Sequence, residues 1–211
     1  RVKSHIGLGT AYRSQGKLDA ALHCYEYASC IAPNDYSPRW NRSLVLLTRG
    51  EFDAGFREFE YREYKPELPG ITLWRGEDVK NRRMIIVSEQ GLGDTFQFIR
   101  FCSTLHSLGA LVTFQCPRYL HPILESLPFL DNILADDHKP LPKSVFDYYC
   151  PLLSLPHVLD TSLDSIPLRD GYLTPDAKLV AKWSEAMGNR NNLRIGIVWQ
   201  GNPFHSWDSL R

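Results

Sequence analysis

The spacing of apolar side chains changes once along the chain, near residue 82. Residues 1–68 carry apolar positions at helical spacing, and β-branched and apolar runs follow at Met84–Ser88 and Leu111–Cys116. Between these runs, apolar residues at i, i+3, i+4 and i+7 predict a helix from Asp94 to about Leu108. Because strands alternate with helices over short connections, the pattern predicts a parallel sheet covered on both faces.

Later segments extend this α/β pattern. The further elements expected are a helix from Pro117 to about Leu127, strands at Asn132–Ala135 and Phe146–Tyr149, and a short helix near Leu152–Leu159. Thr174 is expected to cap a helix that has Pro175 at its first position and runs to about Met187. Leu193–Trp199 reads as a new buried strand.

These elements predict a domain order. Pro66, Pro69 and Gly70 end the helical region. We expect helical repeats at residues 1–68, a linker at 69–81, an α/β domain at 82–187, and the first strand and loop of an incomplete domain at 193–211. The chain therefore reads as a fragment of something longer.

A repeat organises the helical region. Gly16-Lys17-Leu18-Asp19-Ala20 recurs 34 residues later as Gly50-Glu51-Phe52-Asp53-Ala54. The first copy resembles a tetratricopeptide repeat at Leu8, Gly9, Tyr12, Ala21, Tyr25, Ala28 and Pro33. The second copy departs from it, with Ser43, Gly55 and Arg62 where Gly9, Ala21 and Ala28 stand in the first. Two repeats are too few to be stable alone, so the array must continue upstream or pack on the downstream part of the chain.

Composition excludes several classes of function. Lys and Arg number 24, as do Asp and Glu, so the formal net charge is zero. A basic nucleic-acid arm and a polybasic membrane patch are thereby excluded as the main theme. No apolar run nears the roughly 18 residues that span a bilayer. Five cysteines without a C-x-x-C pair argue against a zinc ribbon or a fully paired disulfide framework, and fit a cytoplasmic protein.

The segment Glu89-Gln90-Gly91-Leu92-Gly93-Asp94-Thr95-Phe96-Gln97 holds the candidate chemistry. It lies at the carboxyl end of the first predicted strand of the α/β region, the edge where open α/β sheets bind ligands. Phe96 stands where a dinucleotide fingerprint needs its third glycine, which argues against a nicotinamide or flavin cofactor.

Asp94 has two interpretations that are not exclusive. Asp94-x-x-Gln97 matches a capping box, in which the side chain satisfies free amides of the helix. A helix N-terminus also holds a carboxylate ionised. An ionised carboxylate beside a cleft can act as a general base toward a substrate hydroxyl.

Residues 71–211 resemble bacterial proteins in which tetratricopeptide repeats precede a glycosyltransferase-B region. That region is similar to the ADP-heptose:lipopolysaccharide heptosyltransferases (glycosyltransferase family 9). The stretches that carry the resemblance are Leu73–Glu77, Glu89–Arg100, Phe146-Asp147, Pro151–Pro156 and Ile197–Pro203. The resemblance implies two Rossmann-like domains, of which this chain would hold the acceptor-side one after its tetratricopeptide hairpins.

The resemblance also implies a reaction. Asp94 would be the general base of an inverting, metal-independent transfer of a sugar from a nucleotide-diphosphate sugar to a hydroxyl of a glycan or protein acceptor. No cofactor is implied and no D-x-D pair lies near the cleft; Asp136-Asp137 reads as a loop after a strand. The acceptor side would include Gln90, Gly91, Gly93, Gln97 and Arg100.

The donor side is expected at Gly201, Asn202, His205 and Arg211, which would face the leaving diphosphate. Trp207-Asp208-Ser209 departs from the Asn-Asp-Arg of the family and puts the donor contact in doubt. The repeat face would recruit a protein partner. We expect the isolated fragment to be inactive. The alternative is a non-catalytic interaction protein with a degenerate transferase domain.

Overall fold

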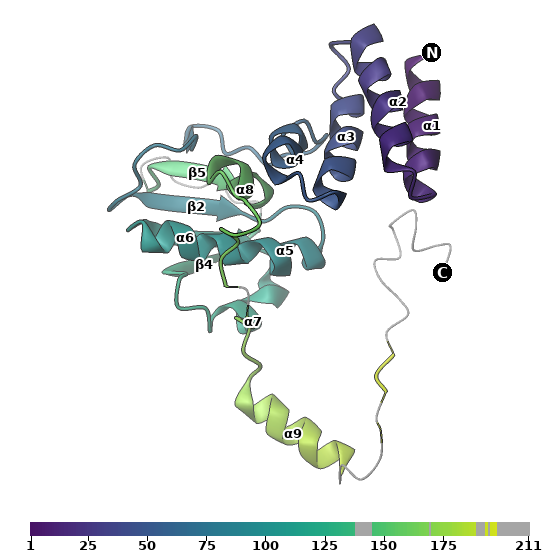
Figure 1. Ribbon diagram of the computed structural model, residues 1–211. Coiled ribbons are helices and arrows are strands. Elements are labelled where there is room, and N and C mark those ends of the chain that lie inside the picture. The colour runs from purple at the N-terminus through teal and green to yellow at the C-terminus, as the bar shows by residue number, and fades with distance from the viewer. Residues whose placement is uncertain (138–144, 169, 189–192, 194, 198–211) are drawn as a thin grey trace. The chain divides into compact units, whose positions relative to one another are not determined.

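The computed structural model describes residues 1–137, 145–168, 170–188, 193 and 195–197 (Figure 1). The chain divides into two compact units, residues 1–174 and residues 175–211. The first unit holds two helical hairpins and a parallel sheet. The last helix of the predicted domain at residues 82–187 lies in the second unit.

Two helical hairpins form the start of the first unit. α1 (Val2–Ser14) pairs with α2 (Leu18–Ile31), and α3 (Ser37–Thr48) pairs with α4 (Phe52–Phe59). The turn glycines Gly16 and Gly50 have φ of 73° and 79°, which glycine adopts without a Cβ penalty. Lys17 N–H donates to the Tyr12 carbonyl at 2.9 Å, and the equivalent bond from Glu51 to Leu46 measures 3.0 Å. The 34-residue sequence period is thus also a period of the backbone.

A five-stranded parallel sheet follows in the spatial order β1-β5-β2-β3-β4. The strands are β1 (Thr72–Leu73), β2 (Arg83–Val87), β3 (Leu111–Cys116), β4 (Asn132–Ala135) and β5 (Tyr148–Pro151). β3 and β4 have the predicted bounds. β5 begins two residues later than predicted, because Tyr148 is the residue that pairs with Met84. β1 lies within residues 69–81, so the segment expected to be only a linker contributes an edge strand.

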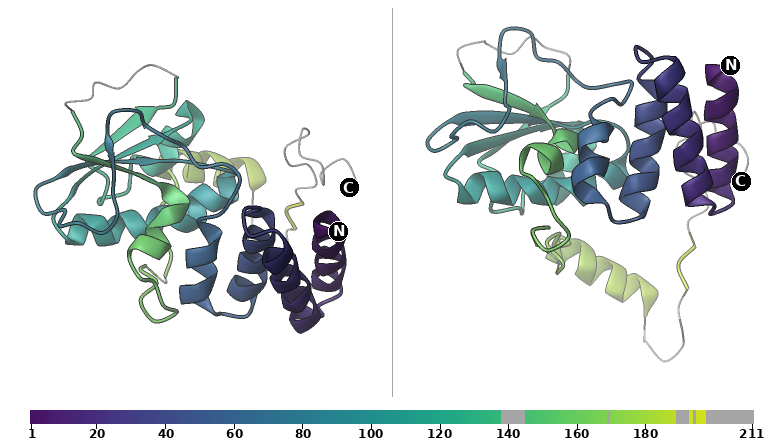
Figure 2. Two further views of the ribbon diagram at one scale, coloured as in Figure 1. Left: turned by 90° about the horizontal axis from the view of Figure 1, so that it is seen from above. Right: turned by 45° about the horizontal axis from the view of Figure 1, so that its top comes forward.

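The helical segments between the strands are shorter than predicted. α5 (Leu92–Phe98), η1 (Ile99–Phe101) and α6 (Cys102–Ser107) stand where one helix was expected. η2 (Arg118–Leu120) and α7 (His121–Leu124) follow β3, and η3 (Leu152–Ser154) and α8 (Leu155–Val158) follow β5. Figure 2 shows α5 and α6 running along one side of the sheet.

The main core lies between the sheet and these helices. Met84, Ile86 and Phe114 of the strands share a buried cluster with Cys102 and Leu105 of α6. Alternate strand residues face the other side, where Ile85 and Tyr149 cluster with Ile71 and Phe146. In the described part of the chain, this second cluster includes no helical residue. The prediction of helices on both faces is therefore not met there.

The second hairpin shares the main core. Phe59 of α4 belongs to that core, and Trp40 and Leu47 of α3 pack against it. The Phe56 and Phe98 rings lie 6.4 Å apart, edge to face, which joins α4 to α5. The expectation that the repeats need further packing is thus confirmed on the downstream side.

The second unit contains α9 (Ala177–Met187). Its N-cap is Asp176, whose carboxylate accepts a 2.9 Å bond from Leu179 N–H, so the prediction of Thr174 as the cap is wrong. Leu193, Ile195 and Ile197 are 88%, 75% and 70% exposed and lie outside any strand. At these described positions the predicted buried strand is absent, because an apolar run is buried in a sheet only where neighbouring strands pair with it.

Candidate functional site

The glycine-rich segment connects β2 to α5 at the carboxyl edge of the sheet. Ser88 N–H still donates to the Gln115 carbonyl at 2.9 Å, so pairing continues one residue past β2. Gln90 then adopts φ of 59°, in the left-handed region that a non-glycine residue rarely enters. Gly91 returns to extended backbone and is the N-cap of α5. The chain therefore turns sharply between a fully paired strand and a helix.

Asp94 lies in the first turn of α5 and is half-buried. Its Oδ2 accepts a 3.0 Å hydrogen bond from Gly91 N–H. Asp94 thus caps the helix from its third position, and the prediction that it forms a capping box with Gln97 is wrong in register. The residue is only partly buried, so a role as cap and a role as base are both compatible with its position.

The other predicted acceptor-side residues surround this carboxylate unequally. Gln90, Gly91, Gly93 and Gln97 are exposed. A Cβ built at Gly93 would meet no atom within 4 Å, so open space lies beside the loop. Gln90, Gly91 and Gly93 thus lie at the start of α5, and Gln97 lies one helical turn further along it.

Arg100 is held differently. Its guanidinium lies over the Tyr172 ring, 4.8 Å from the ring centroid, and Nη2 donates to the Tyr172 hydroxyl at 3.5 Å. The Tyr172 hydroxyl in turn bonds to the Phe96 carbonyl. Arg100 Nε is buried and has no hydrogen-bond partner in the described structure. Tyr172 is thus bound to α5 through Phe96 and to η1 through Arg100, and Arg100 keeps one buried donor without a partner in the described structure.

The sequence analysis did not predict the buried ion pair between Arg62 and Glu89, which anchors the start of the glycine-rich loop. Arg62 Nε and Nη2 each donate to the Glu89 carboxylate at 2.8 Å, and the side chains are only 1% and 0% exposed. Leu153 N–H donates to the same carboxylate at 2.9 Å. The pair thereby joins the end of the second hairpin, the glycine-rich loop and the turn after β5.

Further polar contacts complete this buried network. Arg62 also donates to the Ser154 hydroxyl at 2.9 Å and to Glu60 Oε1 at 2.9 Å. Burial by itself would lower the pKa of Arg62, but the hydrogen bonds and negative charge of Glu89 and Glu60 outweigh it, so the pKa is raised. Arg62 therefore stays charged, and the hydrogen bonds of the network satisfy its guanidinium although the side chain is buried.

The signal for this network was present in the sequence. Arg62 occupies the position where the first repeat has the small Ala28. In the first hairpin Ala28 is a fully buried residue of α2. In the second, the same position reaches into the sheet region, where only a charged partner such as Glu89 makes an arginine tolerable.

The predicted donor residues Gly201, Asn202, His205 and Arg211 lie outside the described residues, as does the Trp207–Ser209 departure. Asp136 and Asp137 follow β4 as predicted, and Asp137 lies 3.7 Å from Arg118. Across the described ranges, no group of three or more His, Cys, Asp or Glu residues is placed to hold a metal ion. None of the helices in those ranges has the length and apolar character to cross a bilayer.

Comparison with known proteins gives distant similarity only. No family model matches the chain. The chain is similar to Protein FlbA of Caulobacter vibrioides, at 25% identity over 92% of this chain and 39% of FlbA. A mutant of the Thermobaculum terrenum O-GlcNAc transferase aligns with 67% of this chain and 35% of its own, at 14% identity and a TM-score of 0.28. The chain thus spans less than two fifths of the length of either protein.

Proposed function

We propose that this chain supplies the acceptor-side part of an inverting glycosyltransferase, similar to the heptosyltransferases, with Asp94 as the general base. The observation that supports it most is the place of Asp94. A half-buried carboxylate stands in the first turn of a helix, beside exposed Gly91 and Gly93, at the carboxyl edge of a parallel sheet.

The proposed reaction requires few other groups on the acceptor side. Asp94 takes the proton of an acceptor hydroxyl while that oxygen bonds to the anomeric carbon of a nucleotide-diphosphate sugar. The bond from that carbon to the diphosphate breaks, and the diphosphate leaves with the electron pair. Gln90 and Gln97, both exposed beside Asp94, can orient the hydroxyl through their amides. Donors at Gly201, Asn202, His205 and Arg211 would stabilise the leaving charge.

The helical hairpins serve recruitment in this proposal. The 34-residue period of sequence and backbone supports tetratricopeptide repeats, whose stacked hairpins present an extended face to a protein. The repeats would bring the acceptor, or a protein that carries it, to the sheet edge.

The test uses the full-length protein with a panel of radiolabelled nucleotide-diphosphate sugars. Asp94→Asn keeps an oxygen that can accept the Gly91 N–H bond but removes the base. We expect turnover to fall by about 100-fold or more, within the 10²–10⁴ range of general base catalysis, with little change in melting temperature. Asp53→Asn is the matched control, because Asp53 is also a carboxylate in the first turn of a helix but is exposed on α4, away from the glycine-rich loop.

A non-catalytic interaction protein is the second candidate, and the hydrogen bond from Gly91 N–H to Asp94 favours it. A carboxylate fully explained by capping needs no catalytic role. Under this alternative, the unchanged full-length protein shows no turnover with any donor of the panel. Asp94→Ala then lowers stability by about 1 kcal/mol through loss of the cap, and Asp94→Asn leaves partner binding unchanged. Normal turnover of Asp94→Asn would remove Asp94 from the mechanism.

A further inference from the structure

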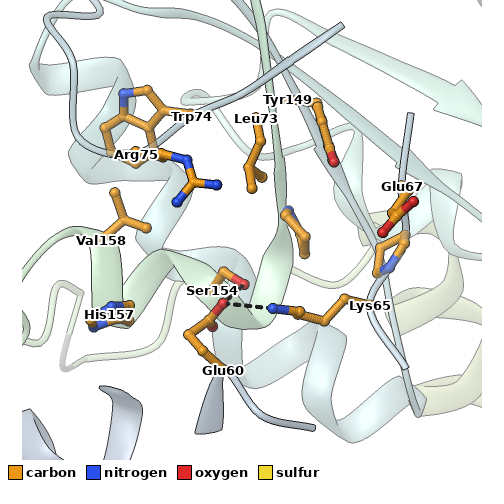
Figure 3. Close-up of a pocket in the computed structure, with 12 residues that line it drawn as sticks. Glu60, Lys65, Glu67, Leu73, Trp74, Arg75, Tyr149, Ser154, His157 and Val158 are labelled. Carbon is orange, nitrogen blue, oxygen red and sulfur yellow. Dashed lines mark hydrogen bonds and ion pairs between the residues drawn. The ribbon is translucent and has the colours of Figure 1, made fainter. Parts of the chain in front are cut away.

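A cavity separate from the Asp94 loop opens between the end of the second hairpin and the sheet (Figure 3). Its volume is about 510 Å³, within the usual size range of small-molecule sites. Its walls come from the chain after α4, from the residues that end β1 and β5, and from α8. The polar side chains that line it are those of Glu60, Lys65, Glu67, Arg75, Tyr149, Ser154 and His157.

Two nitrogen-bearing side chains of the lining lack partners in the described ranges, that of Arg75 after β1 and that of His157 in α8. The Arg75 guanidinium projects into the cavity, and only the backbone N–H of Arg75 is engaged, by Glu77 at 2.7 Å. Within the described part of the chain, neither that guanidinium nor the His157 ring makes a hydrogen bond or ion pair. We propose that this cavity binds a small phosphate ester, with Arg75 and His157 holding the phosphate.

Glu60, the acidic residue on the cavity floor, has both carboxylate oxygens occupied by contacts with neighbouring side chains. Glu60 Oε1 accepts from Arg62 at 2.9 Å. Glu60 Oε2 accepts from the Ser154 hydroxyl at 3.1 Å and lies 3.4 Å from Lys65 Nζ. The Arg75 guanidinium makes no ion pair with Glu60 or Glu67 in the described structure, and a guanidinium matches the paired oxygens of a phosphate.

Tyr149 and Glu67 line the opposite wall of the cavity and can bind the part of the ligand that carries the phosphate. Burial, with the nearby Glu67 carboxylate, raises the pKa of Tyr149, so its hydroxyl stays protonated and can donate. Glu67 is exposed and can accept from hydroxyl groups. The apolar lining of Leu73, Pro151 and Val158 covers a carbon body between the two polar walls. The cavity thus favours an ester with a hydroxylated body over inorganic phosphate.

The cavity also meets the buried network under the glycine-rich loop. Glu60 and Ser154 line the cavity and both bond to Arg62, whose main partner is Glu89. A ligand in the cavity would therefore contact Glu60 and Ser154, which help Arg62 to hold Glu89, the residue before Gln90. This site does not depend on the proposed transfer reaction.

The test is an NMR titration of the ¹⁵N-labelled chain at constant ionic strength. Glycerol 3-phosphate and inorganic phosphate are the probes, and acetate is the comparator. We expect saturable shifts at residues 65–67, 74–76 and 154–158, with glycerol 3-phosphate the tighter probe. Arg75→Gln should weaken binding at least tenfold, and His157→Phe about threefold, since each removes donors to the anion.

Arg82→Gln is the matched control, because Arg82 is an equally exposed arginine at the amino end of β2, away from the cavity. Its affinity should equal that of the unchanged chain. Absence of saturation, shifts outside these three segments, or full binding by Arg75→Gln would overturn the site. Acetate binding as tightly as phosphate would overturn the phosphate assignment.

Discussion

Single residues set how closely the first two helices approach. Gly9 is buried in α1, and a Cβ at this position would lie 2.6 Å from Cε1 of the Tyr25 ring. Tyr25 is fully buried and its hydroxyl lies 3.2 Å from the Thr10 hydroxyl, so the ring has no room to withdraw. The absence of one methyl group at Gly9 therefore fixes the distance between α1 and α2.

Gly9→Ala should destabilise the protein by about 1–3 kcal/mol, because overpacking against Tyr25 outweighs the better helix propensity of alanine. Gly7→Ala in the same helix is the control. Gly7 is exposed and a Cβ there meets nothing within 4 Å, so the substitution should stabilise by up to about 1 kcal/mol. Urea unfolding of both variants measures the difference. Equal effects of the two substitutions would contradict the close contact.

Cysteine reactivity is also decided residue by residue. Cys30 is exposed, whereas Cys24, Cys102, Cys116 and Cys150 are buried. Burial raises the pKa of Cys116 to about 12 and raises the pKa values of Cys102 and Cys150 well above the ordinary range. At pH 8 we expect one thiol to react quickly with Ellman's reagent and the others to react only on unfolding. Cys30→Ser should abolish the fast phase; a second fast thiol would contradict the packing.

At the scale of elements, an ion pair between Arg83 and Asp147, here called the clamp, supports the pairing of β2 with β5. Arg83 N–H donates to Asp147 Oδ2 at 2.8 Å, and the Arg83 guanidinium bonds the same carboxylate at 3.1 and 3.3 Å. These contacts stand at the amino ends of β2 and β5, where register is set. The Phe146-Asp147 stretch that entered the sequence resemblance thus has a structural role in this fold.

The clamp makes stability depend on pH. The hydrogen bonds from Arg83 hold the pKa of Asp147 below its ordinary value of 3.8. Because the folded pKa is the lower one, the clamp stabilises fully above pH 3.8 and loses its effect as pH falls through the folded pKa. Asp147→Asn should therefore be less stable at pH 7, and the gap should close in strong acid. Melting temperatures from pH 7 to pH 2 measure it; a gap that widens in acid would refute the clamp.

On the scale of the whole first unit, one ion pair joins helices to sheet. Arg62 follows α4, and Glu89 follows β2, so their contact links segments 27 positions apart. Both charges are desolvated, and Leu153 N–H shares the Glu89 carboxylate. Breaking such a pair leaves an uncompensated buried charge, which costs far more than losing a surface pair.

Arg62→Leu should destabilise the protein by about 3–5 kcal/mol, because Glu89 is then buried without a counter-charge. Adding Glu89→Leu should recover part of the loss. Arg57→Leu is the control, since the pair of Arg57 with Asp53 lies on the surface of α4, and its loss should cost less than about 0.5 kcal/mol. Chemical unfolding gives the free energies of unfolding of the unchanged protein, of Arg62→Leu, Glu89→Leu and their double variant, and of Arg57→Leu. Additive losses in the double variant would argue against a direct pair.

Local features of the sequence determined the hairpins and the inner strands. A 34-residue period with turn glycines at 16 and 50 leaves the backbone few options, and the β-branched runs at 84–88 and 111–116 suit only buried strands. The position of the glycine-rich turn at the carboxyl edge followed from the same alternation. Each turn and each strand depends on residues within a few positions of one another, and the 34-residue period only repeats such a local pattern.

Tertiary structure alone decided the rest. Residues 72–73 became a strand because β5 offered an unpaired edge, and Arg62 became a buried anchor because Glu89 and Ser154 converge on it. The exposed Leu193, Ile195 and Ile197 show the converse, an apolar run without strand neighbours in the described structure. Such outcomes depend on which distant segments come into contact when the chain folds. A local pattern of apolar and polar positions does not specify the segment that a residue will contact.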